Sequence, residues 1–250
     1  MAKKPLHLRS FLTGAAGALV LAAGVWVWQW HPDHPRAFVS YAQQGEDYVM
    51  RDIFVQLLGI EHPTYIDIGA HDPIVNNNTY LFYQGGSKGV LVEPNPDFTD
   101  LLKKTRPRDV VLDVGIGAEA DDQLVDYYVM WNGNGQLNTF SPDEAKESDR
   151  HVRKVIKRTL VNVNKILGQY FPNGPPDLFS TDTEGYDLTI LKTLDFDKFR
   201  PHVFCVETKD DAGKLERPIL DFLASKGYEI RGATWVNTIF VDSRFLEKKK

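Results

Sequence analysis

Acidic side chains recur at the points where short apolar segments of this chain end. In TYIDIGAHDP an acid precedes a glycine and a histidine follows it, at Asp67, Gly69 and His71. Acids also close the segments GVLVE, VVLD, FSTD and VFCVE. A second acid lies two residues after the end of FSTD. These acids are Glu93, Asp113, Asp182 with Glu184, and Glu207. Parallel sheets bind ligands beyond the carboxyl ends of their strands, so this pattern predicts one shared ligand site.

The first two strand ends have the features of an adenosine site. Gly69 lets the backbone turn tightly and approach a ligand without a Cβ in the way. Glu93 ends the next expected strand, where a carboxylate can accept two hydrogen bonds from a ribose diol. The loop reads GAHDPI and lacks the G-x-G-x-x-G spacing that brings a pyrophosphate to a helix N-terminus, and no G-x-x-x-x-G-K-[ST] triphosphate loop occurs. An adenosine ligand without a pyrophosphate cradle indicates S-adenosylmethionine.

The later strand ends offer acidic groups for methyl transfer, and a family resemblance of the sequence implies that the acceptor atom is an oxygen. The protein must align the acceptor oxygen with an activated methyl group, which can supply about 7–11 kcal/mol, and must take the acceptor's proton. Asp182, Glu184 and His71 are the candidate bases, in that order. Asp182 and Glu184 are also the candidate ligands for a divalent cation such as Mg²⁺. Alternatively, the two acids only cap the following helix, and His71 is a turn residue.

Alternating strands and helices must position these side chains. Strands are expected at 64–69, 89–93, 109–117, 122–131, 177–182 and 202–208, with a terminal antiparallel pair in 228–232 and 234–242. Helices are expected within 40–59, 77–86, 98–107, 160–171, 185–194 and 214–227. Residues 132–150 lack apolar periodicity and are expected to form a long polar loop. The alternation predicts an α/β domain with a mostly parallel sheet that is covered on both faces.

The N-terminus differs in kind from the rest of the chain. A basic tail, 1–10, precedes residues 11–30, which carry no charged side chain and end among three tryptophans. About twenty apolar residues suffice to cross a bilayer, so 11–30 is expected to be a single-pass signal-anchor helix. A cleavable signal peptide is the alternative. The Pro-containing segment 31–39 is then a linker to a domain at 40–250.

Composition excludes several other classes of protein. The net charge is −5, and the basic residues do not gather into one stripe. Nucleic-acid binding is therefore not expected, because it needs a dense cationic surface. The single cysteine, Cys205, cannot form an intramolecular disulfide and is expected to be buried in a core strand. Nothing in the sequence indicates an oligomeric state.

Several segments, in their order along the chain, resemble the FkbM-type S-adenosylmethionine-dependent methyltransferases. They are SYAQQGEDYVMRDIF, TYIDIGAHDP, NNTYLFYQGG, GVLVEPNPD, LNTF and DLFSTDTEGYDLTILKTLDFDKFRPHVFCVET. The strongest element is D-x-E-G-Y-D after an apolar strand, and the likeness extends over roughly residues 40–242.

This resemblance implies a class I, Rossmann-like methyltransferase fold, a doubly wound seven-stranded sheet with an antiparallel C-terminal hairpin. It also implies that Asp67, Gly69, Ala70 and His71 line the cofactor with Glu93 on the ribose, and the acid Asp113 is added to this set. The sequence departs from the family pattern at Pro73, where many members have glycine, and at Thr181 and Thr183, where apolar residues are commoner.

The sequence therefore predicts a membrane-anchored methyltransferase that acts on a hydroxyl of a sugar, glycan or other small metabolite. The acceptor's identity is expected to depend on the loop 132–150. The alternative is an inactive FkbM-like module that serves binding or trafficking. The basic tail predicts that the domain lies on the far side of the membrane from the cytosol, where S-adenosylmethionine is made, so the side on which it functions stays open.

Overall fold

The computed structural model describes residues 39–120, 122–131, 138–147, 151–209 and 215–246. The chain divides into two units, Met1–Val39 and Ser40–Lys250, and the described helices and strands belong to the second. The expected anchor helix at 11–30 lies outside the described residues. Within them, every helix is too short or too polar to cross a membrane.

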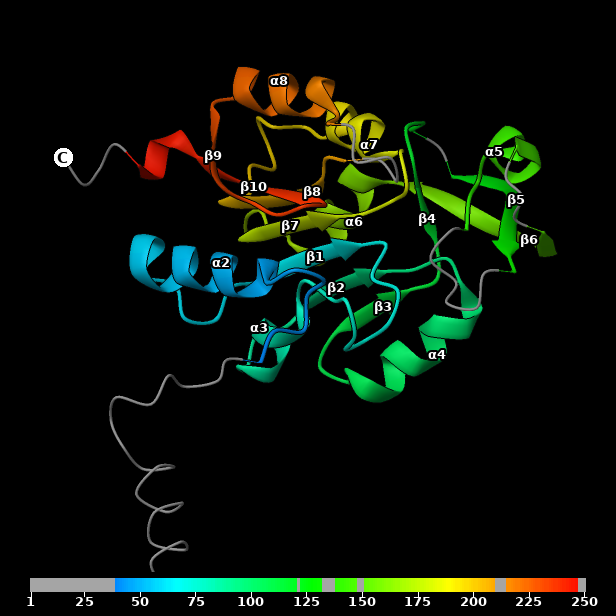
Figure 1. The fold of residues 1–250 in the computed structure, drawn as a ribbon, viewed down its shortest axis with the longest axis horizontal. Coiled ribbons are helices and arrows are strands. Elements are labelled where there is room, and N and C mark those ends of the chain that lie inside the picture. The colour runs from blue at the N-terminus through cyan, green and yellow to red at the C-terminus, as the bar shows by residue number, and fades with distance from the viewer. Residues whose placement is uncertain (1–38, 121, 132–137, 148–150, 210–214, 247–250) are drawn as a thin grey trace, which may run out of the picture. The chain divides into compact units, whose positions relative to one another are not determined.

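A seven-stranded mixed sheet forms the centre of the domain (Figure 1). Its strand order is β3-β2-β1-β7-β8-β10-β9, and only β10 runs antiparallel to its neighbours. The strands are β1 (Tyr65–Ile68), β2 (Gly89–Val92), β3 (Val110–Leu112), β7 (Leu178–Thr181), β8 (Val203–Glu207), β9 (Tyr228–Ala233) and β10 (Asn237–Asp242). This order confirms the doubly wound sheet and the C-terminal antiparallel hairpin that the sequence predicts.

Helices cover both faces of the sheet, each over its own apolar core (Figure 1). One layer holds α6 (Val163–Tyr170), α7 (Asp187–Thr193) and α8 (Arg217–Ser225). The other holds α2 (Glu46–Asp52), the π-helix Ile53–Leu58 that continues it, α3 (Tyr80–Gln84) and α4 (Pro96–Thr105). Because both faces are covered, the central strands are buried throughout, and Cys205 in β8 is buried as expected.

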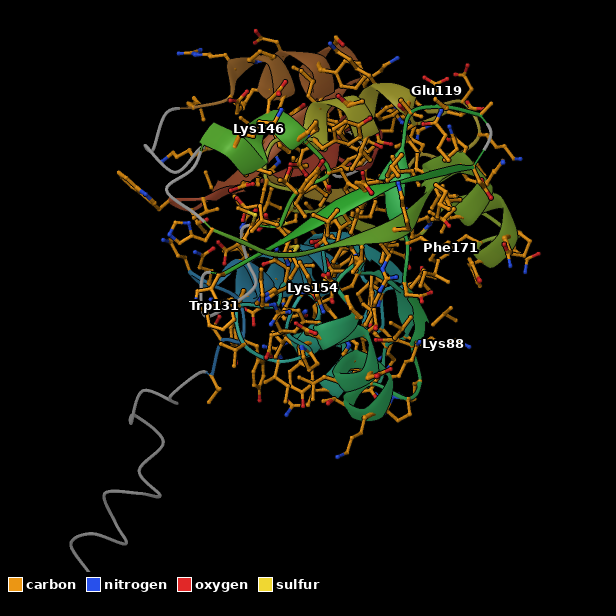
Figure 2. The ribbon with its side chains drawn as sticks, turned by 90° about the vertical axis from the view of Figure 1, so that its right-hand side faces the viewer. Lys88, Glu119, Trp131, Lys146, Lys154 and Phe171 are labelled. Carbon is orange, nitrogen blue, oxygen red and sulfur yellow. The ribbon has the colours of Figure 1, made fainter. Side chains whose placement is uncertain are left out.

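A second, three-stranded sheet was not predicted. It has the order β4-β6-β5 and comprises β4 (Gly115–Gly117), β5 (Gln123–Met130) and β6 (Val152–Asn162). Figure 2, in which β5 and β6 cross the front of the molecule, shows Trp131 at the end of β5 and Lys154 on β6. Asp97 of α4 pairs with Arg153 and Lys154, and the Arg158 Nε donates to the Pro94 carbonyl at 2.6 Å. The small sheet is therefore fastened to the loop that follows β2.

Three expected boundaries are corrected by this second sheet. The segment 109–117 is not one strand, because β3 belongs to the large sheet and β4 to the small one. The helix expected from residue 160 begins at Val163, where the Asn162 side chain accepts a hydrogen bond from the Asn164 amide. The helix α5 (Pro142–Glu147) lies within the loop expected at 132–150, which is described only at 138–147.

Candidate active site

A cavity of about 750 Å³ opens at the carboxyl ends of β1, β2, β7 and β8. The small sheet and the turn between β9 and β10 complete its walls, with Tyr127, Leu160 and Trp235 among the lining residues. Six of the predicted site residues or strand-end acids line it: Gly69, His71, Glu93, Asp182, Glu184 and Glu207.

Gly69 joins the ends of β1 and β7. Its φ of 80° is left-handed, and a Cβ at this position would lie 1.9 Å from the carbonyl oxygen of Asp182. The Asp182 amide in turn donates to the Ile68 carbonyl at 3.0 Å, so the two loops run side by side beyond the strands. Only glycine permits this approach, which confirms the reason for expecting glycine at a close turn.

Glu93 fixes the loop after β1 through both of its carboxylate oxygens. Oε2 accepts a hydrogen bond from the His71 amide at 2.8 Å, and Oε1 accepts one from the Asn95 amide at 2.7 Å. Burial raises the pKa of Glu93 to about 7 despite these two bonds. A carboxylate oxygen has two lone-pair sites, so each can accept a further bond from a ligand hydroxyl at the cavity wall.

Asp67 lies beneath the cavity and not among its lining residues. Its carboxylate accepts a hydrogen bond from the Thr79 hydroxyl at 2.7 Å, and burial raises its pKa. The Thr79 hydroxyl also accepts from the fully buried Arg106 at 3.0 Å. Asn77 links this network to the loop, because its Nδ2 donates to the Ala70 and Asp72 carbonyls, each at 3.0 Å. The structure thus gives Asp67 a supporting place under the cofactor loop.

The remaining predicted cofactor residues have different positions. Ala70 is buried and packs in the core on the α2–α4 side. His71 lines the cavity on the Glu93 side, and its ring packs against Phe98 with centroids 4.0 Å apart. Asp113 is exposed after β3 and does not line the cavity, whereas Val114 and Gly115, directly after it, do.

Asp182 and Glu207 form a hydrogen-bonded pair of carboxyl groups on the opposite wall. Burial, then repulsion from Asp187, raises the pKa of Asp182 to about 7. Burial, then repulsion from Asp182, raises that of Glu207 to about 10. Two carboxylates this close cannot both be charged at low cost, so near neutral pH the pair holds at least one proton. The pair matches the acid–base group that sequence analysis expected at Asp182.

The loop after β7 is held by the threonines that depart from the family pattern. The Thr181 hydroxyl donates to the Asp187 carboxylate at 2.6 Å, and burial raises the pKa of this carboxyl. The Thr183 amide donates to the same carboxylate at 3.3 Å, and Thr183 lines the cavity. Asp187, rather than Asp182 or Glu184, is the acid in the first turn of α7. The alternative that Asp182 and Glu184 merely cap this helix therefore does not describe the loop.

The geometry gives no support to Asp182 and Glu184 as candidate ligands of a divalent cation. Asp182 and Glu184 both line the cavity, and Glu184 is exposed with a left-handed φ of 54°. Within the described ranges, however, no three histidine, cysteine or acidic side chains converge as metal ligands would. Asp182 instead bonds the Glu207 carboxyl.

Sequence reasoning missed the aromatic and basic groups at the mouth of the cavity. Tyr186 is 40% exposed and Trp235 65% exposed, and both line the cavity beside Lys209. The Lys209 ammonium lies 4.4 Å from the centroid of the Trp235 ring. Lys209 and Trp235 are far apart in sequence and meet only because β10 pairs with β8, so no local pattern could have indicated them.

The segment before α2 closes one side of the site. Glu46 is fully buried and accepts hydrogen bonds from the Gln44 amide and from the Thr234 hydroxyl, at 2.8 and 2.6 Å. The Gln44 side chain accepts from the Trp235 amide at 2.6 Å. The neighbouring Gln43 lines the cavity. The segment SYAQQGEDYVMRDIF, which resembles the family, thus holds the turn between β9 and β10 in place.

A doubly wound seven-stranded sheet of this order, with a ligand cavity at the carboxyl ends of β1, β2, β7 and β8, defines the class I methyltransferase fold. The family model described as "Methyltransferase FkbM domain" matches residues 67–230, and the chain belongs to this family. This confirms the resemblance seen in the sequence. The match leaves out Gln43 and Trp235, which also line the cavity.

Solved structures of low sequence identity align along most of the chain. A TehB-like SAM-dependent methyltransferase from Corynebacterium glutamicum has 10% identity and a TM-score of 0.42, covering 92% of this chain and 99% of its own. An O-methyltransferase from Bacillus cereus in complex with SAH has 12% identity and a TM-score of 0.40, and the alignment covers 90% of this chain and 89% of the Bacillus chain. TM-scores this low carry no argument, so the fold assignment rests on the strand order and the family. No curated protein sequence matches the chain significantly.

Proposed function

We propose that this protein transfers the methyl group of S-adenosylmethionine to a hydroxyl of a sugar, glycan or other small metabolite. The observation that carries the proposal is the cavity's two unlike walls, with Glu93 on one side and the Asp182–Glu207 pair on the other. The first wall suits a ribose diol, and the second suits removal of a proton from an acceptor.

The residues present fit this cofactor. Glu93 retains acceptor capacity toward the cavity, and the left-handed turn at Gly69 brings the loop after β1 to the cavity wall, which Thr183 also lines. When bound, S-adenosylmethionine supplies a methyl group already activated on a sulfonium. The protein's own contribution is to hold the acceptor hydroxyl in line and to accept its proton.

Asp182 is the base in this proposal. A pKa near 7 leaves much of its carboxylate ionised at neutral pH while keeping it basic enough to accept a proton. Glu207, with the higher pKa, is the protonated partner that donates a hydrogen bond to Asp182 and orients it. When the acceptor oxygen gains the methyl group, its proton passes to the Asp182 carboxylate, and both carboxyl groups of the pair are then neutral. Glu184 and His71 remain the second and third candidates.

The membrane part of the proposal rests on sequence alone. The charge-free run 11–30, with its basic flank and terminal tryptophans, anchors the domain as a single-pass helix. On which side of the membrane the domain functions is left open. Protease protection of the domain in sealed membrane vesicles measures this directly.

Calorimetric titration of the full chain with S-adenosylhomocysteine, with NAD as the control ligand, tests the cofactor. We expect micromolar binding of S-adenosylhomocysteine and none of NAD, because the loop after β1 has no pyrophosphate cradle. Absence of S-adenosylhomocysteine binding by folded protein would overturn the proposal and favour the inactive binding module. Methyl transfer to a set of hydroxylated acceptors, assayed with and without Mg²⁺, then tests the expected metal.

A further inference from the structure

The acceptor side of the cavity is distinct from the cofactor side. Tyr186, Lys209 and Trp235 lie beyond the ends of β7, β8 and β9, across the sheet from Glu93, which directly follows β2. In the sheet order, β1 and β7 separate β2 from β8. A cofactor whose ribose is bound by Glu93 therefore leaves these three side chains for the second substrate.

Two aromatic side chains at this mouth expose large surfaces. Trp235 is 65% exposed although its backbone amide is fixed by Gln44 at 2.6 Å, and Tyr186 is 40% exposed. Large aromatic side chains give a ligand a large contact area and lose little conformational entropy on binding. Exposed ones beside a cavity therefore indicate contact with a ligand. The apolar C–H face of a pyranose ring suits such a surface.

Polar groups that line the same cavity suit several hydroxyls. Gln43, Thr183 and Glu184 line it next to the carboxyl pair. The Thr183 hydroxyl can both donate and accept hydrogen bonds, so it suits a ligand hydroxyl at this wall of the cavity. A ligand with one apolar face and many hydroxyl groups fits this arrangement better than a flat aromatic compound does.

Lys209 adds a positive charge at the mouth. In the described part of the chain its ammonium contacts the Trp235 ring, at 4.4 Å from the centroid, rather than a carboxylate. A cation on an aromatic face keeps its donors available to an anion, which a cation in a tight ion pair does not. An acidic group on a ring stacked at Trp235 would lie next to this ammonium.

We infer that the acceptor is an acidic sugar, with its ring on Trp235 and its carboxylate on Lys209. This inference rests on the proposed methyl transfer and specifies its substrate class. S-Adenosylmethionine also carries a carboxylate, so Lys209 has two possible anionic partners, and the experiment must separate them.

Saturation-transfer NMR on the full chain saturated with S-adenosylhomocysteine tests the inference, with methyl glucuronide and methyl glucoside as probes. We expect the glucuronide to bind about three- to tenfold more tightly, as one partly screened charge pair allows. Lys209→Met should bring the two sugars within twofold of each other, and Trp235→Ala should weaken both at least fivefold. Trp131→Ala is the matched control, because Trp131 is 70% exposed but does not line the cavity, and should change neither.

Calorimetry of S-adenosylhomocysteine on the same variants separates the outcomes. Unchanged affinity in Lys209→Met supports the assignment of Lys209 to the acceptor. A loss of S-adenosylhomocysteine affinity in that variant assigns Lys209 to the cofactor's carboxylate and overturns the inference. Equal binding of both sugars to the unmodified protein, or binding of neither, overturns it too. Failure of the unmodified protein to bind S-adenosylhomocysteine at all is instead a failure of the proposed function.

Discussion

The α-carbon of Gly69 lies against the carbonyl group of Asp182, so that the loop after β1 and the loop after β7 touch through their backbones. A Cβ on Gly69 would lie 1.9 Å from that carbonyl oxygen. The position of the proposed base is therefore coupled to the position of the cofactor loop, and the two parts of the site cannot move independently.

Gly69→Ala should separate these loops and abolish S-adenosylhomocysteine binding. The variant combines a left-handed φ, which costs an L-residue about 1–2 kcal/mol, with a backbone clash. Gly59→Ala is the control, because Gly59 has a φ of 74° but no atom within 4 Å of the added Cβ. Thermal unfolding and calorimetry measure both effects. Equal loss of ligand binding in the two variants would contradict the coupling.

Glu93→Ala should weaken S-adenosylhomocysteine binding at least tenfold, since each hydrogen bond to a charged group contributes about 1.5–3 kcal/mol. Asp113→Ala should leave it unchanged, because the Asp113 side chain is exposed and outside the cavity. Titration calorimetry of the two variants side by side decides between them. A loss of affinity in Asp113→Ala would restore the role that sequence analysis gave this residue.

The stability of the ligand-free protein should fall as pH rises from 5 to 9. The pKa of Glu93 and that of Asp182 are raised to about 7 and that of Glu207 to about 10, so in this range the folded state binds more protons than the unfolded chain. The stability that these groups contribute is complete below their unfolded pKa, near 4, and is lost as pH rises through the folded values.

Asp182→Asn should make this fall shallower, because it removes one titrating acid and the repulsion that raises the pKa of Glu207. The unfolding temperature at pH 5, 7 and 9 measures the slope. The pKa values of Asp177 and Asp242 are lowered, so these acids affect stability only at lower pH and do not confuse the comparison. A variant whose unfolding temperature falls as steeply as that of the unmodified protein would count against the carboxyl pair.

Arg106→Met should destabilise the domain by about 3–5 kcal/mol, as removal of one member of a buried ion pair does. The side chains of Arg106 and Asp109 are both fully buried, 2.8 Å apart, and Arg106 also donates to Asn77 at 2.9 Å. Arg231→Ala, which removes an exposed pair with Glu229, should cost less than about 1 kcal/mol. Urea unfolding of both variants gives the comparison, and similar midpoints would show that the Arg106 network is not important for stability.

Much of the large sheet could be predicted from the sequence, since β1, β2, β3, β7 and β8 are apolar runs with an acid at or next to their carboxyl end. The position of Asp67 could not, because a residue one place before the strand end can face either the cavity or the layer beneath it. The small sheet was missed because β6 mixes apolar residues with Arg153, Lys154, Lys157 and Arg158, and does not alternate cleanly. The strand β6 is stabilised by its pairing with β5, and the apolar periodicity of its own sequence does not reveal that pairing.

The role of Glu207 depends on contacts that are remote in sequence. Whether this acid joins a site depends on its distance from Asp182, and that distance is set by the pairing of β7 with β8. The same is true of Trp235, which β10 brings beside Lys209. Sequence analysis identified the groups that end single strands and missed those whose function arises between strands.

The segment that begins the folded domain is also part of the rim of its active site. Asp47 accepts hydrogen bonds from the Ser40 hydroxyl and the Tyr41 amide, at 2.7 and 2.8 Å, while Gln43 lines the cavity and Gln44 holds the turn at Trp235. Shortened versions of the protein for crystallisation or engineering therefore need to start before Ser40. A version trimmed to the family-matched residues 67–230 would lack one wall of the substrate site, so its inactivity would say nothing about the enzyme.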